Sequence, residues 1–155
     1  MTYMQINLQK NAKDISVIIN SGLHSSRDQY DEAFEEAEKW LNDIITRNPK
    51  LTPKIGYCEV CGCTKGLEVH HLAGRKHDSC TIMVCEQCHR LLSEWQKMWG
   101  NKWEHGYQPE RLRRAFFLLG LRDMLRLKAK KTGYSIYESM ADNLTDEISI
   151  LLKGE

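Results

Sequence analysis

The chain has 155 residues, of which 41% are hydrophobic, and its formal net charge is +1 at pH 7. This length predicts a single domain that buries roughly two-thirds of its unfolded surface. The near-zero charge excludes a polycation, so any affinity for nucleic acid must come from a local basic patch. No apolar run is long enough to cross a membrane, and the start of the chain lacks the apolar segment of a signal peptide. We therefore expect a cytoplasmic protein without a membrane partner.

The N-terminal part of the chain contains one clear helix. Residues 14–19 are rich in β-branched side chains, which suit either a short strand or a helical turn, and the sequence does not decide between them. A helix is predicted to begin at Ser26, which can form a capping box with Gln29. Its apolar residues form one stripe and its other face is acidic. The helix is expected to end before Pro49.

Two Cys-x-x-Cys pairs follow the first helix. A two-residue spacer lets both sulfurs of a pair face one ion, so four thiolates in two such pairs suit a closed tetrahedral zinc site. Disulfides are the alternative in a secreted chain, but paired cysteines in a reducing cytosol are more often metal ligands. The sequence therefore predicts a structural Zn²⁺ held by Cys58, Cys61, Cys85 and Cys88.

A β-hairpin and a helix are predicted between and after the cysteine pairs. Residues 67–72 alternate between apolar and polar side chains, as a half-buried strand does. Residues 73–75 include a glycine that turns the chain, and residues 81–84 form a second short β run. From Glu86 onward, apolar residues recur at steps of three and four, which predicts a helix.

Three histidines lie in this strand–strand–helix unit. His70 and His71 are adjacent near the end of the first strand, and His89 directly follows the last cysteine. Neighbouring strand residues point to opposite faces, so one histidine of the pair can coordinate a metal ion while the other is held apart. Zinc at the base of the unit is expected to bring the pair close to His89 at the start of the helix.

The segments EVHHLAG and VCEQCH resemble the HNH nuclease family, whose ββα-metal unit is often held by two such cysteine pairs. The resemblance implies that His70 and His89 bind a catalytic divalent cation (Mg²⁺, Mn²⁺, Ni²⁺ or Zn²⁺). It also implies that His71 is the general base, and that the protein is an endonuclease that hydrolyses phosphodiester bonds of DNA. The chemistry suits these roles, because neutral imidazole can take a proton from water near neutral pH.

Two positions depart from the family pattern. The family's asparagine fixes the base histidine through a backbone hydrogen bond, and its position holds Cys80, whose thiol is a weak donor and acceptor. Asp78 or Ser79 would then have to replace it. The family's last metal ligand falls on Ser93, a poor ligand, and Glu94 is the neighbouring alternative. A second interpretation is therefore a catalytically inactive zinc-binding module that binds nucleic acid or a protein partner.

A long basic helix is predicted from Pro109 to Lys131, closed by Gly133. Its cations greatly outnumber its carboxylates, as a groove for a phosphate backbone requires. The alternative is that these cations pair with the acidic first helix, which would add little stability on the surface. Together with two cations in the hairpin loop, the candidate DNA contacts are Arg75, Lys76, Arg111, Arg113 and Arg114.

The sequence thus predicts a mainly α fold with a small β-hairpin, in which a zinc-stapled ββα unit is embedded among helices. This unit spans residues 55–100 and lies between an N-terminal helical segment with its linker (1–54) and a C-terminal helical segment (101–155). A last helix, from about residue 135 to 152, is expected to pack as core or as a dimer surface. A third interpretation is a structural subunit that forms a homo-oligomer through its terminal helices.

Overall fold

A computed structural model of the protein describes residues 12–21, 27–48 and 55–154, with the backbone alone for residues 27–32. Within these ranges the chain is mainly helical and has a single antiparallel sheet of two strands. The predicted fold class is therefore confirmed. No helix in the described part of the chain is both long enough and apolar enough to span a membrane.

The elements follow the predicted order, with the hairpin and its helix between N-terminal and C-terminal helices. Residues 12–19, which the sequence leaves undecided, are helical. The predicted helix start at Ser26 and the linker 50–54 lie outside the described residues. The elements that come after residues 12–19 are α2 (Arg27–Thr46), β1 (Leu67–His71), β2 (Thr81–Cys85), α3 (Glu86–Gln96), η2 (Lys97–Trp99), α4 (Asn101–Glu104), α5 (Glu110–Thr132), α6 (Ser135–Asp142) and α7 (Thr145–Lys153).

The prediction of one last helix is wrong, because this segment forms two helices, α6 and α7. The chain turns between them at Asn143. The side-chain amide of Asn143 donates hydrogen bonds to the carbonyl oxygens of Ile19 (2.7 Å) and Ser21 (2.9 Å). These partners come from the start of the chain, so a local pattern of apolar residues cannot reveal the break.

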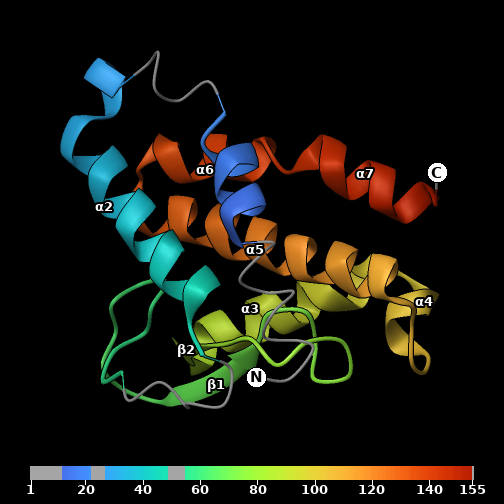
Figure 1. Ribbon diagram of the computed structural model, residues 1–155. Helices are drawn as coiled ribbons and strands as arrows, with labels where there is room; N and C mark the ends of the chain where they lie inside the picture. Colours follow the sequence, from blue (N-terminus) through green and yellow to red (C-terminus); the bar gives the residue numbers. More distant parts are fainter. Residues whose placement is uncertain (1–11, 22–26, 49–54, 155) are drawn as a thin grey trace.

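Helix α5 runs through the middle of the molecule, with α6 and α7 along one side and α3 on the other (Figure 1). Every residue from Ala115 to Leu121 is buried. Helices of the same chain therefore cover this helix on two sides. Trp99 adds to this packing, since its ring stacks on Phe116 at an interplanar angle of 6°.

Helix α5 approaches the end of β1 very closely at Gly120. A Cβ atom at this position would lie 2.1 Å from the carbonyl oxygen of Leu72, so only glycine permits the contact. On the other side of the same turn, the indole nitrogen of Trp103 donates a hydrogen bond to the carbonyl of Ala73 (2.8 Å). The end of the hairpin is therefore fixed between α5 and the segment after α3.

The register of the hairpin sends the two adjacent histidines to different surroundings. Glu68 and His70 face α3, where both side chains meet residues of that helix. Val69 and His71 lie on the opposite face, because successive strand residues alternate. The paired residues are Leu67 with Cys85, Glu68 with Val84, Val69 with Met83, His70 with Ile82 and His71 with Thr81.

Candidate metal centre and histidine cluster

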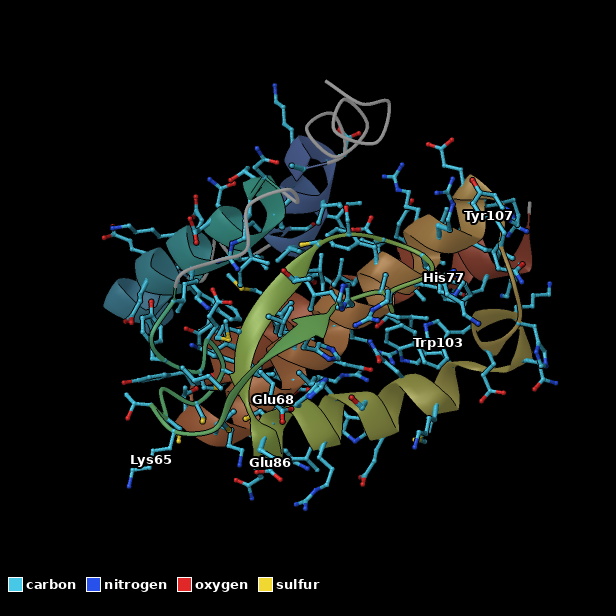
Figure 2. All side chains as sticks on the ribbon, turned by 90° about the horizontal axis from the view of Figure 1, so that it is seen from below. Lys65, Glu68, His77, Glu86, Trp103 and Tyr107 are labelled. Atoms are coloured by element: carbon cyan, nitrogen blue, oxygen red, sulfur yellow. The ribbon has the colours of Figure 1, made fainter. Side chains whose placement is uncertain are left out.

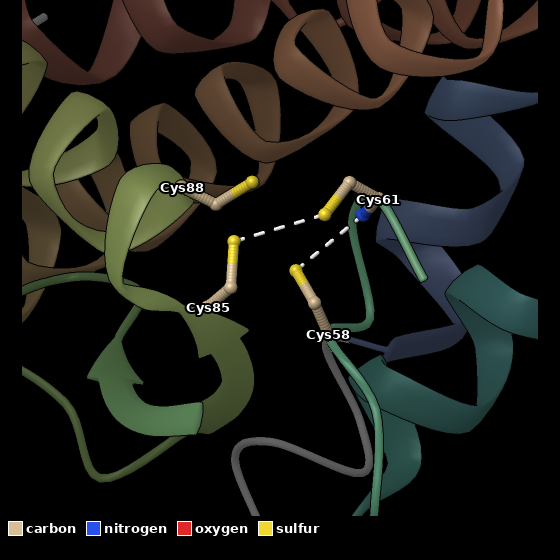
Figure 3. A group of neighbouring side chains, drawn as sticks. All are labelled: Cys58, Cys61, Cys85 and Cys88. Carbon is tan, nitrogen blue, oxygen red and sulfur yellow. Dashed lines mark hydrogen bonds between the residues drawn. The ribbon is translucent and has the colours of Figure 1, made fainter. Parts of the chain in front are cut away.

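Four cysteine sulfurs meet at the base of the hairpin, as Figure 3 shows for Cys58, Cys61, Cys85 and Cys88. Their Sγ atoms all lie within 4.8 Å of one another, and those of Cys61 and Cys85 are 3.7 Å apart. Tetrahedral coordination with Zn–S bonds of about 2.3 Å would separate the sulfurs by about 3.8 Å. The cluster could therefore bind a metal such as zinc, as the sequence predicts.

The first cysteine pair lies in a tight loop that is closed by backbone amides. The backbone N–H of Cys61 points to the Sγ of Cys58 at 3.4 Å, and the N–H of Gly62 donates to the carbonyl of Cys58 at 2.8 Å. Gly62 has a φ of 83°, a conformation that glycine adopts without steric cost. This loop therefore presents both thiols to one point in space.

The second cysteine pair lies at the start of α3. Cys85 is its N-cap residue and Cys88 lies in its first turn, where the helix dipole favours negative charge. Burial would raise the pKa of Cys85, but hydrogen bonds from the Cys88 backbone and the neighbouring thiols lower it to about 7. Burial and the charge of Cys58 raise the pKa of Cys88. Four thiolates so close together need a cation to remain deprotonated.

Glu59, in the first cysteine loop, is buried and fully paired. Its carboxylate accepts two hydrogen bonds from the Arg47 guanidinium (2.6 and 3.1 Å) and one from the backbone N–H of Met83 (2.7 Å). Lys128 donates to the carbonyl of Glu59 (2.8 Å). Burial would lower the pKa of Arg47, but its hydrogen bonds to Glu59 and a second carboxylate raise it. The pairing joins the cysteine loop to α2, β2 and α5, and nothing in the local sequence signals it.

Two of the three predicted histidines meet on the α3 face of the hairpin. The ring centroids of His70 and His89 are 5.3 Å apart, at an interplanar angle of 72°. Burial, followed by the nearby His89 and His71, lowers the pKa of His70 to about 3. The Glu68 carboxylate contacts Nδ1 of His89. Glu68 is absent from the predicted site, although its position two residues before His70 gives it the same strand face.

Glu68, His70 and His89 do not form a closed set of three ligands. Among the described residues, the four cysteines are the only group of three or more Cys, His, Asp or Glu side chains close enough to share an ion. The predicted additional ligands, Ser93 and Glu94, are half-buried and exposed respectively. The described contacts include no hydrogen bond or ion pair from either of them to His70 or His89.

His71 lies on the opposite face of β1 and lines a cavity of about 540 Å³. Three predicted DNA contacts, Arg75, Lys76 and Arg113, line the same cavity. Burial, and then the charges of Arg75 and His89, lower the pKa of His71. Its imidazole is therefore neutral at pH 7 and can accept a proton.

Gln96, the last residue of α3, holds the backbone next to His71. Its side-chain amide is buried and donates to the carbonyl oxygens of His71 (2.8 Å) and Leu72 (3.2 Å). The sequence names Asp78 as one replacement for the family's asparagine at Cys80. Asp78 instead accepts a hydrogen bond from the backbone N–H of Cys80 (2.7 Å). Gln96 is thus a site residue that sequence reasoning missed.

The other two predicted DNA contacts lie away from this cavity. Arg111 donates a hydrogen bond to the carbonyl of Leu151 in α7, and Arg114 is half-buried. Neither lines the cavity next to His71. Farther along α5, Arg126 pairs with two acidic residues of α6, so part of the charge of this helix is satisfied within the molecule.

The site therefore has three parts: the cysteine cluster, the histidine cluster of Glu68, His70 and His89, and the cavity next to His71. Comparison with models of protein families, with curated proteins and with solved structures gives no match.

Proposed function

We propose that this protein is a metal-dependent HNH-type endonuclease that hydrolyses phosphodiester bonds of DNA. In this proposal the cysteine cluster binds a structural zinc ion, and His70 and His89 bind a second, catalytic divalent cation. The observation that carries it is the hairpin register, which puts His70 beside His89 while His71 opens onto a cavity with three cationic side chains.

The histidine cluster supplies ligands of the right chemistry for a divalent cation. His70 is neutral because its pKa is lowered to about 3, and a metal ligand must offer an unprotonated nitrogen. Glu68 already contacts His89, so its carboxylate is the nearest candidate for a third ligand. A bound cation would act as a Lewis acid on the phosphoryl oxygen and neutralise charge on the leaving oxygen.

The cavity next to His71 supplies the remaining groups. His71 accepts a proton from water, whose oxygen attacks phosphorus as the bond to the leaving oxygen breaks. Arg75, Lys76 and Arg113 can pair with the phosphate oxygens.

The proposal is tested by incubating supercoiled plasmid with the protein and Mg²⁺, Mn²⁺ or Ni²⁺. We expect nicking by the wild type, and a rate lower by about 10²- to 10⁴-fold for His71→Ala, the range for loss of a general base. His105→Ala is the matched control, since His105 is exposed in the loop before α5 and should nick normally. Absence of nicking in every metal, or full activity of His71→Ala, would contradict the proposal.

A non-catalytic zinc-binding module is the second candidate. It is favoured by the lack of a third ligand that closes the set around His70 and His89 among the described residues. This module would bind nucleic acid or a protein partner through the same surface and would never cut DNA. A plasmid that shifts on a gel but stays supercoiled in all three metals would support it.

A further inference from the structure

Tyr107 is an exposed aromatic side chain beside the cavity that His71 lines. It lies in the loop between α4 and α5, with 79% of its surface accessible. The guanidinium carbon of Arg113 lies 4.9 Å from the centroid of its ring. This cation–π contact covers one face of the ring and leaves the other open. The ring therefore has a cation on one face and solvent around most of its remaining surface.

The cavity joins this ring to a group of cations. Its volume of about 540 Å³ lies within the range of pockets that hold small ligands. Arg75, Lys76 and Arg113 line it, and Asp78 is the only carboxylate among its lining residues. His77, which also lines the cavity, lies at the same end of the molecule as Tyr107, far from Glu86 (Figure 2). Cationic and aromatic side chains thus surround one space.

We propose that Tyr107 stacks on an unpaired base while Arg75 and Lys76 bind the phosphate next to it, so that this site takes single-stranded DNA. The proposal deepens the proposed function and rests on it for the assignment to DNA. Every base has a π-face that an aromatic ring can stack on, and cations along a groove bind the backbone without regard to sequence.

Regular duplex DNA cannot use this arrangement. Its bases are already stacked and paired, and a base must leave the helix before a side chain can stack on it. Duplex could therefore reach only the cations of the cavity. A site built from cations alone would favour duplex, which carries more charge per unit length. Preference for a single strand is consequently the signature of the stacking contact.

The test is fluorescence anisotropy of a labelled single-stranded DNA 20-mer and of a duplex of the same sequence. The full chain carries His71→Ala and no Mg²⁺ is added, so that the DNA is not cut during the measurement. Binding is then measured whether or not the wild type is a nuclease. We expect the single strand to bind more tightly than the duplex. Tyr107→Ala should weaken single-strand binding by about 5- to 150-fold, as loss of one base-stacking contact does, and leave duplex binding unchanged within about twofold.

Two variants control for general effects. Tyr134→Ala removes another exposed tyrosine, in the turn between α5 and α6. It should bind both DNAs as tightly as the protein that carries His71→Ala alone. Tyr107→Trp keeps a stacking surface and should restore single-strand binding. Equal or tighter binding of duplex, an unchanged affinity in Tyr107→Ala, or no binding of either DNA would overturn the inference. If the protein nicks plasmid but shows no preference for single strands, only this inference is overturned. If it prefers single strands but does not nick plasmid, only the proposed endonuclease activity is overturned.

Discussion

Gln96 belongs to α3, but its side-chain amide donates hydrogen bonds to the backbone at the end of β1. The carbonyl oxygen of Leu72 accepts from this buried amide, and that of His71 accepts from Gln96 and from the backbone N–H of Gly74 (3.1 Å). An unsatisfied buried polar group costs more than the hydrogen bond itself contributes. The orientation of the proposed base therefore depends on a residue 25 positions away in the sequence.

We predict that Gln96→Met lowers the free energy of unfolding by about 1–3 kcal/mol, because it removes the buried hydrogen bond to the Leu72 carbonyl and one of two hydrogen bonds to the His71 carbonyl. It should also slow plasmid nicking at temperatures where the variant remains folded. Urea denaturation followed by circular dichroism measures the first effect. Gln108→Met is the control, since Gln108 hydrogen bonds at the surface and its loss should change stability by less than about 0.5 kcal/mol. Equal effects of the two substitutions would contradict this role for Gln96.

Glu59 is a buried carboxylate that pairs with the part-buried Arg47. We predict that Glu59→Gln lowers the free energy of unfolding by about 1–3 kcal/mol, because the part-buried Arg47 charge loses its buried carboxylate partner and keeps only the exposed Asp43. Asp43→Asn removes a carboxylate that also pairs with Arg47 but is exposed, and it should cost about 0–1 kcal/mol. Thermal unfolding of both variants checks the difference, and similar melting temperatures would show that burial does not decide the contribution.

What the sequence predicts at the residue scale depends on local spacing. The four cysteines are recognisable because a two-residue spacer lets both sulfurs of a pair face one ion. His70, His71 and His89 are recognisable because they lie between the cysteine pairs or directly after the second pair. Glu59 and Gln96 carry no such mark. Each acts through a partner distant in the chain, and its role appears only when the elements are assembled.

At the scale of elements, α5 supports the hairpin through one backbone contact. Gly120 lets the helix approach the carbonyl of Leu72, and Trp103 holds the neighbouring carbonyl of Ala73. The turn that follows His71 is thereby fixed from two sides. The geometry of the proposed site therefore depends on how closely this helix can pack.

We predict that Gly120→Ala is strongly destabilising, because its Cβ would lie 2.1 Å from the Leu72 oxygen and α5 would have to move away. Overpacking of this kind costs about 1–3 kcal/mol or more, and nicking should fall with stability. Gly56→Ala is the matched control, since no atom lies within 4 Å of the added Cβ and the backbone is not in the left-handed region. Urea denaturation compares them, and a Gly120→Ala variant as stable as Gly56→Ala would contradict the packing.

Most element types were predictable because their apolar periods are local. The hairpin, α3 and α5 occur where alternating or three-to-four spacing predicts them. The break between α6 and α7 was not predictable, since it depends on the bond from Asn143 to the carbonyl of Ile19. The short helix α4 is another local feature that the spacing of apolar residues does not indicate.

At the scale of the whole molecule, the cysteine cluster joins segments from different elements. It brings together the loop after α2, the end of β2 and the first turn of α3 (Figure 3). Glu59 extends this junction to α2 and α5. With a net charge of only +1, any binding of DNA depends on the local group of cations beside His71 rather than on overall charge.

We propose that one zinc ion holds this junction together and thereby sets the positions of the histidines. Zinc K-edge X-ray absorption of the purified protein tests it most directly. We predict one zinc per chain with four sulfur ligands at about 2.3 Å. A folded, purified protein that contains no zinc, or a zinc ion bound by nitrogen ligands in place of some of the sulfurs, would contradict this proposal.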